Sequence, residues 1–164
     1  MFVSIRNILF PSNFSPVADA ARDYAVALAD QFRAKLHLIH VVPLSLISPR
    51  PATPWVTLEN EMNMRVEVAS QRLQHALDAN WIESGRATHL TVVGFEVEEI
   101  LNYARAHEID LIVMGTHGRR GVSHFLLGSV AEKLVRMAEC PVLTVHRQGR
   151  EVLFDEGSVP YATS

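Results

Sequence analysis

Short apolar runs alternate with longer amphipathic stretches along most of this chain. The short runs have the length and residue types of β-strands, and they are Asn7–Phe10, Leu36–Val42, Thr88–Val93, Leu111–Met114 and Pro141–Val145. Between them, apolar residues recur every three or four positions, which is the period of a helix with one buried face. Strands that alternate with helices predict parallel βαβ units. We therefore expect an α/β domain with an open five-stranded parallel sheet and helices on both faces.

The first two predicted helices have recognisable ends. Ser15 followed by Pro16 is a helix start, because serine caps the free amides and proline fits the first turn. This helix should run to about Phe32. Apolar residues at helical spacing continue through Glu59–Glu83, which predicts the longest helix of the chain, ended by Gly85. Shorter helices are expected after the third and fourth strands.

Two segments show neither period. Pro43–Leu58 contains four prolines and should form a long loop that leaves the carboxyl end of a strand. Loops of this length in a compact domain are usually functional, and this one is placed to fold over a site. From Arg147 onward the chain is mostly polar. We therefore predict one domain over residues 1–146 and a C-terminal tail over residues 147–164.

Composition narrows the classes of protein that fit this pattern. A chain of 164 residues is long enough for one domain with a sizeable core. Its formal net charge of -3 argues against nucleic acid, whose partners are usually basic. Cys140 is the single cysteine, which excludes an internal disulfide. Without a secretion signal or an apolar run of about 20 residues, the chain is expected to be cytoplasmic and to bind no membrane.

One stretch, Met114–Val130, combines several glycines with a predicted strand end and helix start. It reads MGTHGRRGVSHFLLGSV and contains Gly115, Gly118 and Gly128, with Ser129 directly after the last glycine. Glycine lets the backbone approach a ligand closely, and free amides at a helix N-terminus attract anions. This grouping predicts a phosphate-binding loop.

The topology suggests what lies opposite this loop. In open parallel sheets, the ligand crevice lies at the carboxyl ends of the strands where the winding direction reverses. If the first and fourth strands flank that reversal, Pro11–Asn13 and Gly115–Gly118 meet there. The two segments would then line one pocket.

Three segments together resemble the universal stress protein family. They read NILFPSNFS, LHLIHVV, and DLIVMGTHGRRG followed by LLGSVAEKLVRMAECPVLTV, and the similarity extends over Ser4–His146. Nucleotide-binding members carry the pattern Gly-x2-Gly-x9-Gly-Ser/Thr, which Gly115, Gly118, Gly128 and Ser129 match at every position. The chain is thus similar to the ATP-binding subgroup.

This resemblance implies a Rossmann-like sheet of the adenine nucleotide alpha hydrolase-like kind, with ATP, or else AMP or ADP, at the carboxyl ends of the strands. The ligand contacts that it implies come from four segments: Pro11, Ser12 and Asn13 near the adenosine, Val41 near the adenine, Gly115, His117, Gly118 and Arg119 at the phosphates or ribose with Met114 as a further ligand contact beside them, and Gly128, Ser129 and Val130 at the phosphate tail. It also implies homodimers paired through the last strand, Pro141–Val145. An unprotected strand edge favours such pairing on physical grounds as well.

One position departs from the family pattern. ATP-binding members usually carry aspartate where this chain has Asn13, and the change removes a formal charge. It weakens the case for magnesium more than the case for the nucleotide itself.

The sequence assigns no catalytic residue and no metal ligand. His37, His40 and His89 lie on predicted strands, and we expect them in the core or on a sheet face because no acid or cysteine accompanies them at ligand spacing. The favoured hypothesis is an ATP-binding regulatory switch or accessory factor in the stress response. The alternatives are a slow ATP hydrolase or nucleotidyl transferase, and a dimeric interaction module that binds no nucleotide.

Overall fold

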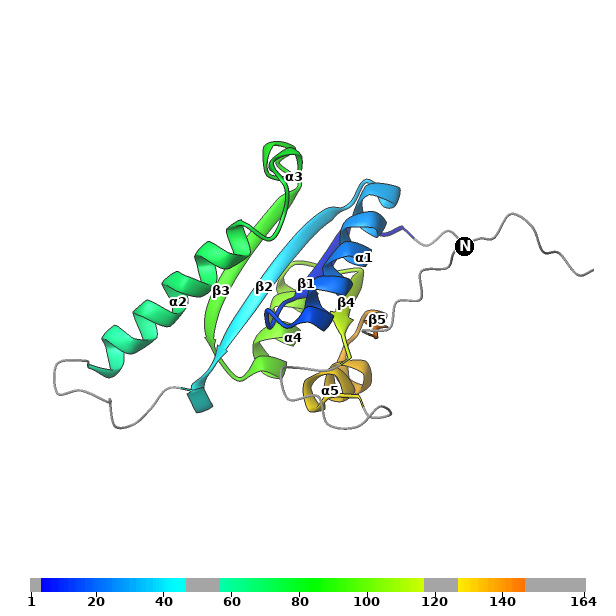
Figure 1. Ribbon diagram of the computed structural model, residues 1–164. Coiled ribbons are helices and arrows are strands. Elements are labelled where there is room, and N and C mark those ends of the chain that lie inside the picture. The colour runs from blue at the N-terminus through cyan, green and yellow to red at the C-terminus, as the bar shows by residue number, and fades with distance from the viewer. Residues whose placement is uncertain (1–3, 47–56, 117–126, 147–164) are drawn as a thin grey trace, which may run out of the picture.

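A parallel sheet forms the centre of the molecule (Figure 1). The computed structural model describes residues 4–46, 57–116 and 127–146. Its five strands lie in the order β3-β2-β1-β4-β5, and all neighbours are parallel. The strands are β1 (Asn7–Pro11), β2 (Lys35–Pro43), β3 (Ala87–Gly94), β4 (Leu111–Gly115) and β5 (Val142–Val145). The predicted fold class is confirmed.

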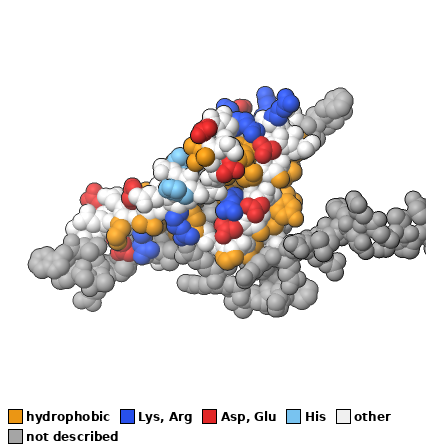
Figure 2. All heavy atoms as spheres, turned by 45° about the horizontal axis from the view of Figure 1, so that its top comes forward, with side chains coloured by type: hydrophobic (Ala, Val, Ile, Leu, Met, Phe, Trp, Pro, Cys, Tyr) orange, Lys and Arg blue, Asp and Glu red, His pale blue; other side chains and the backbone are white. Residues whose placement is uncertain are grey.

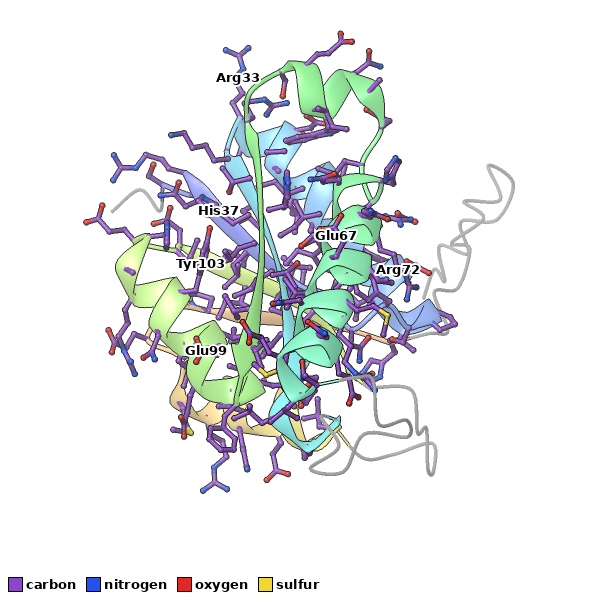
Figure 3. The ribbon with its side chains drawn as sticks, turned by 90° about the vertical axis from the view of Figure 1, so that its left-hand side faces the viewer. Arg33, His37, Glu67, Arg72, Glu99 and Tyr103 are labelled. Atoms are coloured by element: carbon purple, nitrogen blue, oxygen red, sulfur yellow. The ribbon has the colours of Figure 1, made fainter. Side chains whose placement is uncertain are left out.

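Helices cover both faces of this sheet (Figures 1 and 3). They are α1 (Pro16–Phe32), α2 (Leu58–Gln74), α3 (Ala79–Glu83), α4 (Glu96–Ala106) and α5 (Ser129–Met137), with a short 3-10 turn η1 (Leu44–Leu46) after β2. In the view toward the β3 edge in Figure 3, α2 and α4 lie on opposite sides of the strands. Two buried clusters result, one beneath α1 and α2 and the other beneath α4 and α5.

Successive residues of the central strands alternate between these two clusters. In β1, Ile8 and Phe10 belong to the cluster beneath α1 and α2, whereas Leu9 belongs to the cluster beneath α4 and α5. All three side chains are buried, which explains why this strand is a continuous apolar run with no polar alternation.

The prediction of one helix over Glu59–Glu83 is wrong, because two helices occupy that stretch. α2 ends at Gln74, and Asp78 begins α3 by accepting a hydrogen bond from the amide of Trp81 at 3.0 Å. Leu73 and Trp81 both pack in the cluster beneath α1 and α2. The apolar spacing therefore continues across the break between α2 and α3. For this reason the helix cap at Asp78 was not recognised in the sequence.

A carboxylate clamps β1 to the chain before β4. Asp110 Oδ2 accepts hydrogen bonds from the amides of Arg6 at 2.7 Å and Asn7 at 2.9 Å, and the Asp110 amide donates to the Asn7 carbonyl at 2.9 Å. These contacts join residues that are 104 and 103 positions apart in the sequence. They fix the central pair of strands at its amino end, opposite the predicted ligand site.

Candidate functional site

The winding of the sheet reverses between β1 and β4. β1 pairs with β2 on one side and with β4 on the other, in the register Ile8 to Leu111 and Leu9 to Ile112. After β1 the chain continues into α1, and after β4 the next described helix is α5 on the opposite face. The carboxyl ends of β1 and β4 therefore lie side by side, as the sequence predicted, at the position where open sheets of this kind hold ligands.

Hydrogen bonds fix the turn that follows β1. The Ser12 amide donates to the Ile39 carbonyl at 2.8 Å, and Ser12 Oγ accepts from the Phe14 amide at 3.2 Å. Asn13 Oδ1 accepts from the Ser15 amide at 3.1 Å. Asn13 thus uses its side-chain oxygen within the turn, so that a ligand would meet a neutral amide donor here and no negative charge.

Three side chains that the sequence did not assign to the site support the same turn. His40 Nδ1 hydrogen bonds to the Ser12 carbonyl at 2.7 Å, and the His40 ring lies 4.4 Å from the Phe14 ring, centroid to centroid. The guanidinium of Arg72 covers Phe14 at 4.1 Å. Because these residues come from β2, from the turn and from α2, no local sequence pattern could have joined them.

Gly115 has a packing role that differs from the one predicted for it. It is the last residue of β4, and a Cβ placed on it would lie 2.9 Å from Val17 Cγ1 and 3.1 Å from the Val17 backbone. The absence of a side chain therefore lets the first turn of α1 approach β4 closely. This contact brings the start of α1 to the carboxyl end of β4.

The start of α5 lies directly at the end of β4. Gly128 is the N-cap residue and donates its amide to the Thr116 carbonyl at 2.6 Å. Glycine has no side chain to cap the helix, so the first-turn amides of Ser129 and Val130 have no side-chain acceptor from the N-cap. A helix end of this kind favours an anion through both its amides and its dipole.

Thr116 connects three elements at this point, although the sequence pattern did not assign it to the site. It is 1% exposed, its amide donates to the Val145 carbonyl at 3.0 Å, and its Oγ1 lies 3.2 Å from His146 Nδ1. Together with the bond from Gly128, these contacts tie β4 to β5 and to α5. The signal in the sequence that could have identified Thr116 is its position within the MGTHG motif.

Of the remaining residues predicted to contact the ligand, some lie within the described part of the chain and others do not. Val41 and Met114 belong to the same buried cluster beneath α4 and α5, and each is 6% exposed. They lie on β2 and β4, the two strands that flank β1, and so form an apolar floor on that side of the sheet. Pro11, at the end of β1, is half-buried. His117, Gly118 and Arg119 lie outside the described residues.

A separate polar cluster lies between β2, β3 and α4, toward the opposite end of the strands. His37 Nδ1 is 3.0 Å from the Tyr103 hydroxyl and 3.1 Å from Thr88 Oγ1 (Figure 3). His37 is 6% exposed and its Nε2 has no hydrogen-bond partner, whereas the His107 ring stacks on Tyr103 at 3.8 Å. Burial lowers the pKa of His37 to about 4, and the positive charges of His107 and Lys35 add to this effect.

No described group of three or more histidine, cysteine or acidic side chains is arranged to hold a metal ion. Burial raises the pKa of the Cys140 thiol, so the thiolate is disfavoured there. On the face shown in Figure 2, basic and acidic side chains are interspersed and no patch of one sign stands out. The helices within residues 4–46, 57–116 and 127–146 are too short or too polar for any of them to cross a membrane.

Comparison with known proteins assigns this chain to a family. The model of the universal stress protein family matches residues 4–146, which is most of the chain. This chain belongs to the universal stress protein family. It is 32% identical over 148 residues to universal stress protein MJ0531 of Methanocaldococcus jannaschii, a match that covers 89% of this chain and 85% of that protein.

Solved structures of the family share the fold. The structure of MJ0577, also from Methanocaldococcus jannaschii, gives a TM-score of 0.77 at 28% identity and covers 89% of this chain and 99% of that one. A universal stress protein in complex with cAMP gives 0.57 at 22% identity, covering 88% of this chain and 98% of that one. A third, from Archaeoglobus fulgidus and in complex with dAMP, gives 0.53 at 15% identity, with 88% and 99% covered. The last two likenesses concern the fold alone.

Proposed function

We propose that this universal stress protein binds an adenine nucleotide, with ATP as the principal ligand, at the carboxyl ends of β1 and β4. The start of α5 carries this proposal: its N-cap is Gly128, which offers no side-chain cap, and the Gly128 amide bonds to the end of β4. A phosphate group suits such a helix end. The matching glycine spacing in the sequence and the adenine nucleotides in two proteins of the same fold support the choice of ligand.

In this proposal each segment of the site contacts a different part of the nucleotide. The first-turn amides of α5, at Ser129 and Val130, receive the phosphate tail, and Ser12 and Asn13 receive the ribose. The apolar floor formed by Val41 and Met114 receives the adenine, beside Pro11. The contacts of Gly115, and those of His117, Gly118 and Arg119 with the phosphates and ribose, rest on the sequence pattern alone.

We further propose that the nucleotide acts as a regulatory signal. Asn13 brings no charge to the turn, and its oxygen already bonds to the Ser15 amide, so the turn offers no carboxylate to bind magnesium or to activate water. Binding would change a surface that a partner protein recognises. The assembly proposed for this switch is a homodimer paired through β5.

Thermal unfolding with and without ATP tests the nucleotide proposal. A ligand present at about 100 times its dissociation constant stabilises the native state by about 2.7 kcal/mol. We therefore expect a clear rise in melting temperature with millimolar ATP. Denaturing the purified protein should also release an adenine nucleotide, which mass spectrometry would identify. If neither ATP, ADP nor AMP raises the melting temperature, with or without magnesium, the proposal is wrong.

A further inference from the structure

Phe14 has a backbone conformation that its residue type disfavours. Its φ is 56°, and among the described residues other than glycine only Arg33 and Glu108 also have positive values, 53° and 48°. Both of those residues follow the last turn of a helix, where a left-handed residue commonly closes the helix. Phe14 precedes a helix, and a bulky aromatic residue in this region is a genuine outlier. Specific contacts must therefore hold it in place.

Two side chains from other elements contact the Phe14 ring. The His40 ring lies 4.4 Å away, centroid to centroid, with the two ring planes 31° apart, and the Arg72 guanidinium covers the Phe14 ring at 4.1 Å. Arg72 comes from α2, on the opposite side of the sheet from Tyr103 (Figure 3). His40 also bonds through Nδ1 to the Ser12 carbonyl. The cluster of Arg72, Phe14 and His40, called the Phe14 stack below, thus joins α2, the turn and β2.

We infer that Phe14 is a positioning residue for the nucleotide and that its ring sets the conformation of the turn containing Ser12 and Asn13. This inference rests on the proposed function, because it concerns the same site. The amide of Phe14 donates to Ser12 Oγ, so the left-handed backbone of Phe14 orients the side chain that would meet the ribose. A turn fixed before binding loses less conformational freedom when the ligand arrives.

The Phe14 stack couples α2 to the site. α2 buries only Ala69 and Leu73, so its first half has no buried side chain. Arg72 lies between these two anchors in the sequence and adds a contact to the turn. A nucleotide that stabilises the turn must therefore also stabilise the docking of the second half of α2, and the coupling is reciprocal.

Ligand affinity in matched variants tests the inference. Phe14→Gly removes the ring and accepts the positive φ without strain, whereas Arg72→Met leaves the ring in place and removes only the cation. Phe14→Tyr keeps both the ring and its stacking. Arg65→Met is the control, since it makes the same change on the same helix at a residue that pairs with Glu61. Each variant would be titrated with ATP, and its melting temperature without ligand would be recorded.

We expect Phe14→Gly to weaken ATP binding about tenfold, and Arg72→Met about fivefold, the value of one cation–π contact. Phe14→Tyr and Arg65→Met should bind as the original protein does. ATP should slow amide hydrogen exchange over residues 69–74 in the original protein but not in Phe14→Gly. Unchanged ATP affinity in both Phe14→Gly and Arg72→Met would overturn the inference while leaving the proposed function intact. If the original protein binds no nucleotide, the proposed function fails, and the inference fails with it.

Discussion

At the scale of single residues, the approach of α1 to β4 leaves no room for a side chain at Gly115. Gly115→Ala places a methyl group 2.9 Å from Val17 Cγ1 and 3.1 Å from the Val17 backbone, and the backbone cannot move away cheaply. We expect the free energy of unfolding in urea to fall by about 1–3 kcal/mol, the usual cost of overpacking.

A second substitution separates the two contacts of this added methyl group. Val17→Ala removes Cγ1, so the double variant should recover part of the loss, but the contact with the Val17 carbonyl carbon and oxygen remains. Full recovery in the double variant, or no loss in Gly115→Ala, would contradict the packing role assigned to Gly115.

His37 should make the stability of the fold depend on pH. Its pKa is about 4 in the folded protein, against an ordinary value of 6.5, because the ring is buried near His107 and Lys35. The unfolded chain therefore binds a proton at a higher pH than the folded chain does. The neutral ring makes its full contribution to the free energy of unfolding above about pH 6.5, and this contribution is lost as the pH falls toward 4. The full contribution is about 3 kcal/mol.

Urea unfolding between pH 7.5 and 4.5 measures this dependence. His37→Gln cannot titrate, so its free energy of unfolding should fall less steeply over the same range than that of the original protein. His75→Gln is the matched control, because His75 is exposed at the end of α2. Parallel pH profiles for the original protein and His37→Gln would show that His37 does not cause the acid sensitivity.

At the scale of the elements, the cap of α5 affects the stability of the helix and forms part of the proposed phosphate site. Gly128 has φ -60° and ψ 152°, which any residue can adopt, so Gly128→Asp fits the backbone. The carboxylate would occupy the first-turn amides and add a negative charge where the phosphate is proposed to bind. We expect the stability without ligand to stay equal or rise by about 0.5 kcal/mol, and ATP binding to weaken more than tenfold.

Gly128→Asn separates charge from shape in this experiment. Asparagine caps the helix as well as aspartate does but carries no charge, so ATP binding should weaken less than in Gly128→Asp. Calorimetric titration of the two variants with ATP measures the difference. Equal affinities in the original protein and Gly128→Asp would mean that no phosphate binds at this helix end.

The elements differ in how well the sequence could predict them. The strands, and the start of α1 at Ser15 and Pro16, follow from local pattern, and the structure has them within one or two residues of the prediction. The break between α2 and α3 was missed because Leu73 and Trp81 serve one buried cluster. In the candidate site, Ser12, Asn13 and Gly128 could be proposed from the sequence because they lie at the ends of elements. His40 and Arg72 were not, because only the folded chain brings them to Phe14.

At the scale of the whole molecule, β5 is an edge strand of the sheet that the described residues form. Val142–Val145 is its last strand, and Leu143 is 38% exposed. Pro141 and Val145 bond through their carbonyls to Ile112 and Thr116, so by alternation the amides of Val142 and Thr144 face outward. Thr144→Pro should therefore keep the pairing with β4 and block pairing with a second chain.

Sedimentation velocity measures the outcome for the proposed dimer. We expect the original protein to sediment as a dimer and Thr144→Pro as a monomer with an unchanged circular dichroism spectrum. His89→Pro is the control, since it places a proline on β3, the opposite edge of the sheet. A dimer that survives Thr144→Pro would require an interface elsewhere.

The clamp between Asp110 and the start of β1 also limits how early the domain can finish folding during synthesis. Arg6 leaves the ribosome early, but its partner carboxylate is made 104 residues later, and α5 later still. Both halves of the proposed nucleotide site therefore come together only when nearly the whole domain has been translated. In the proposed function, nucleotide therefore cannot guide the nascent chain and binds only domains that are already complete. Chains that stop before α5 would gain no protection from it and would remain open to proteases.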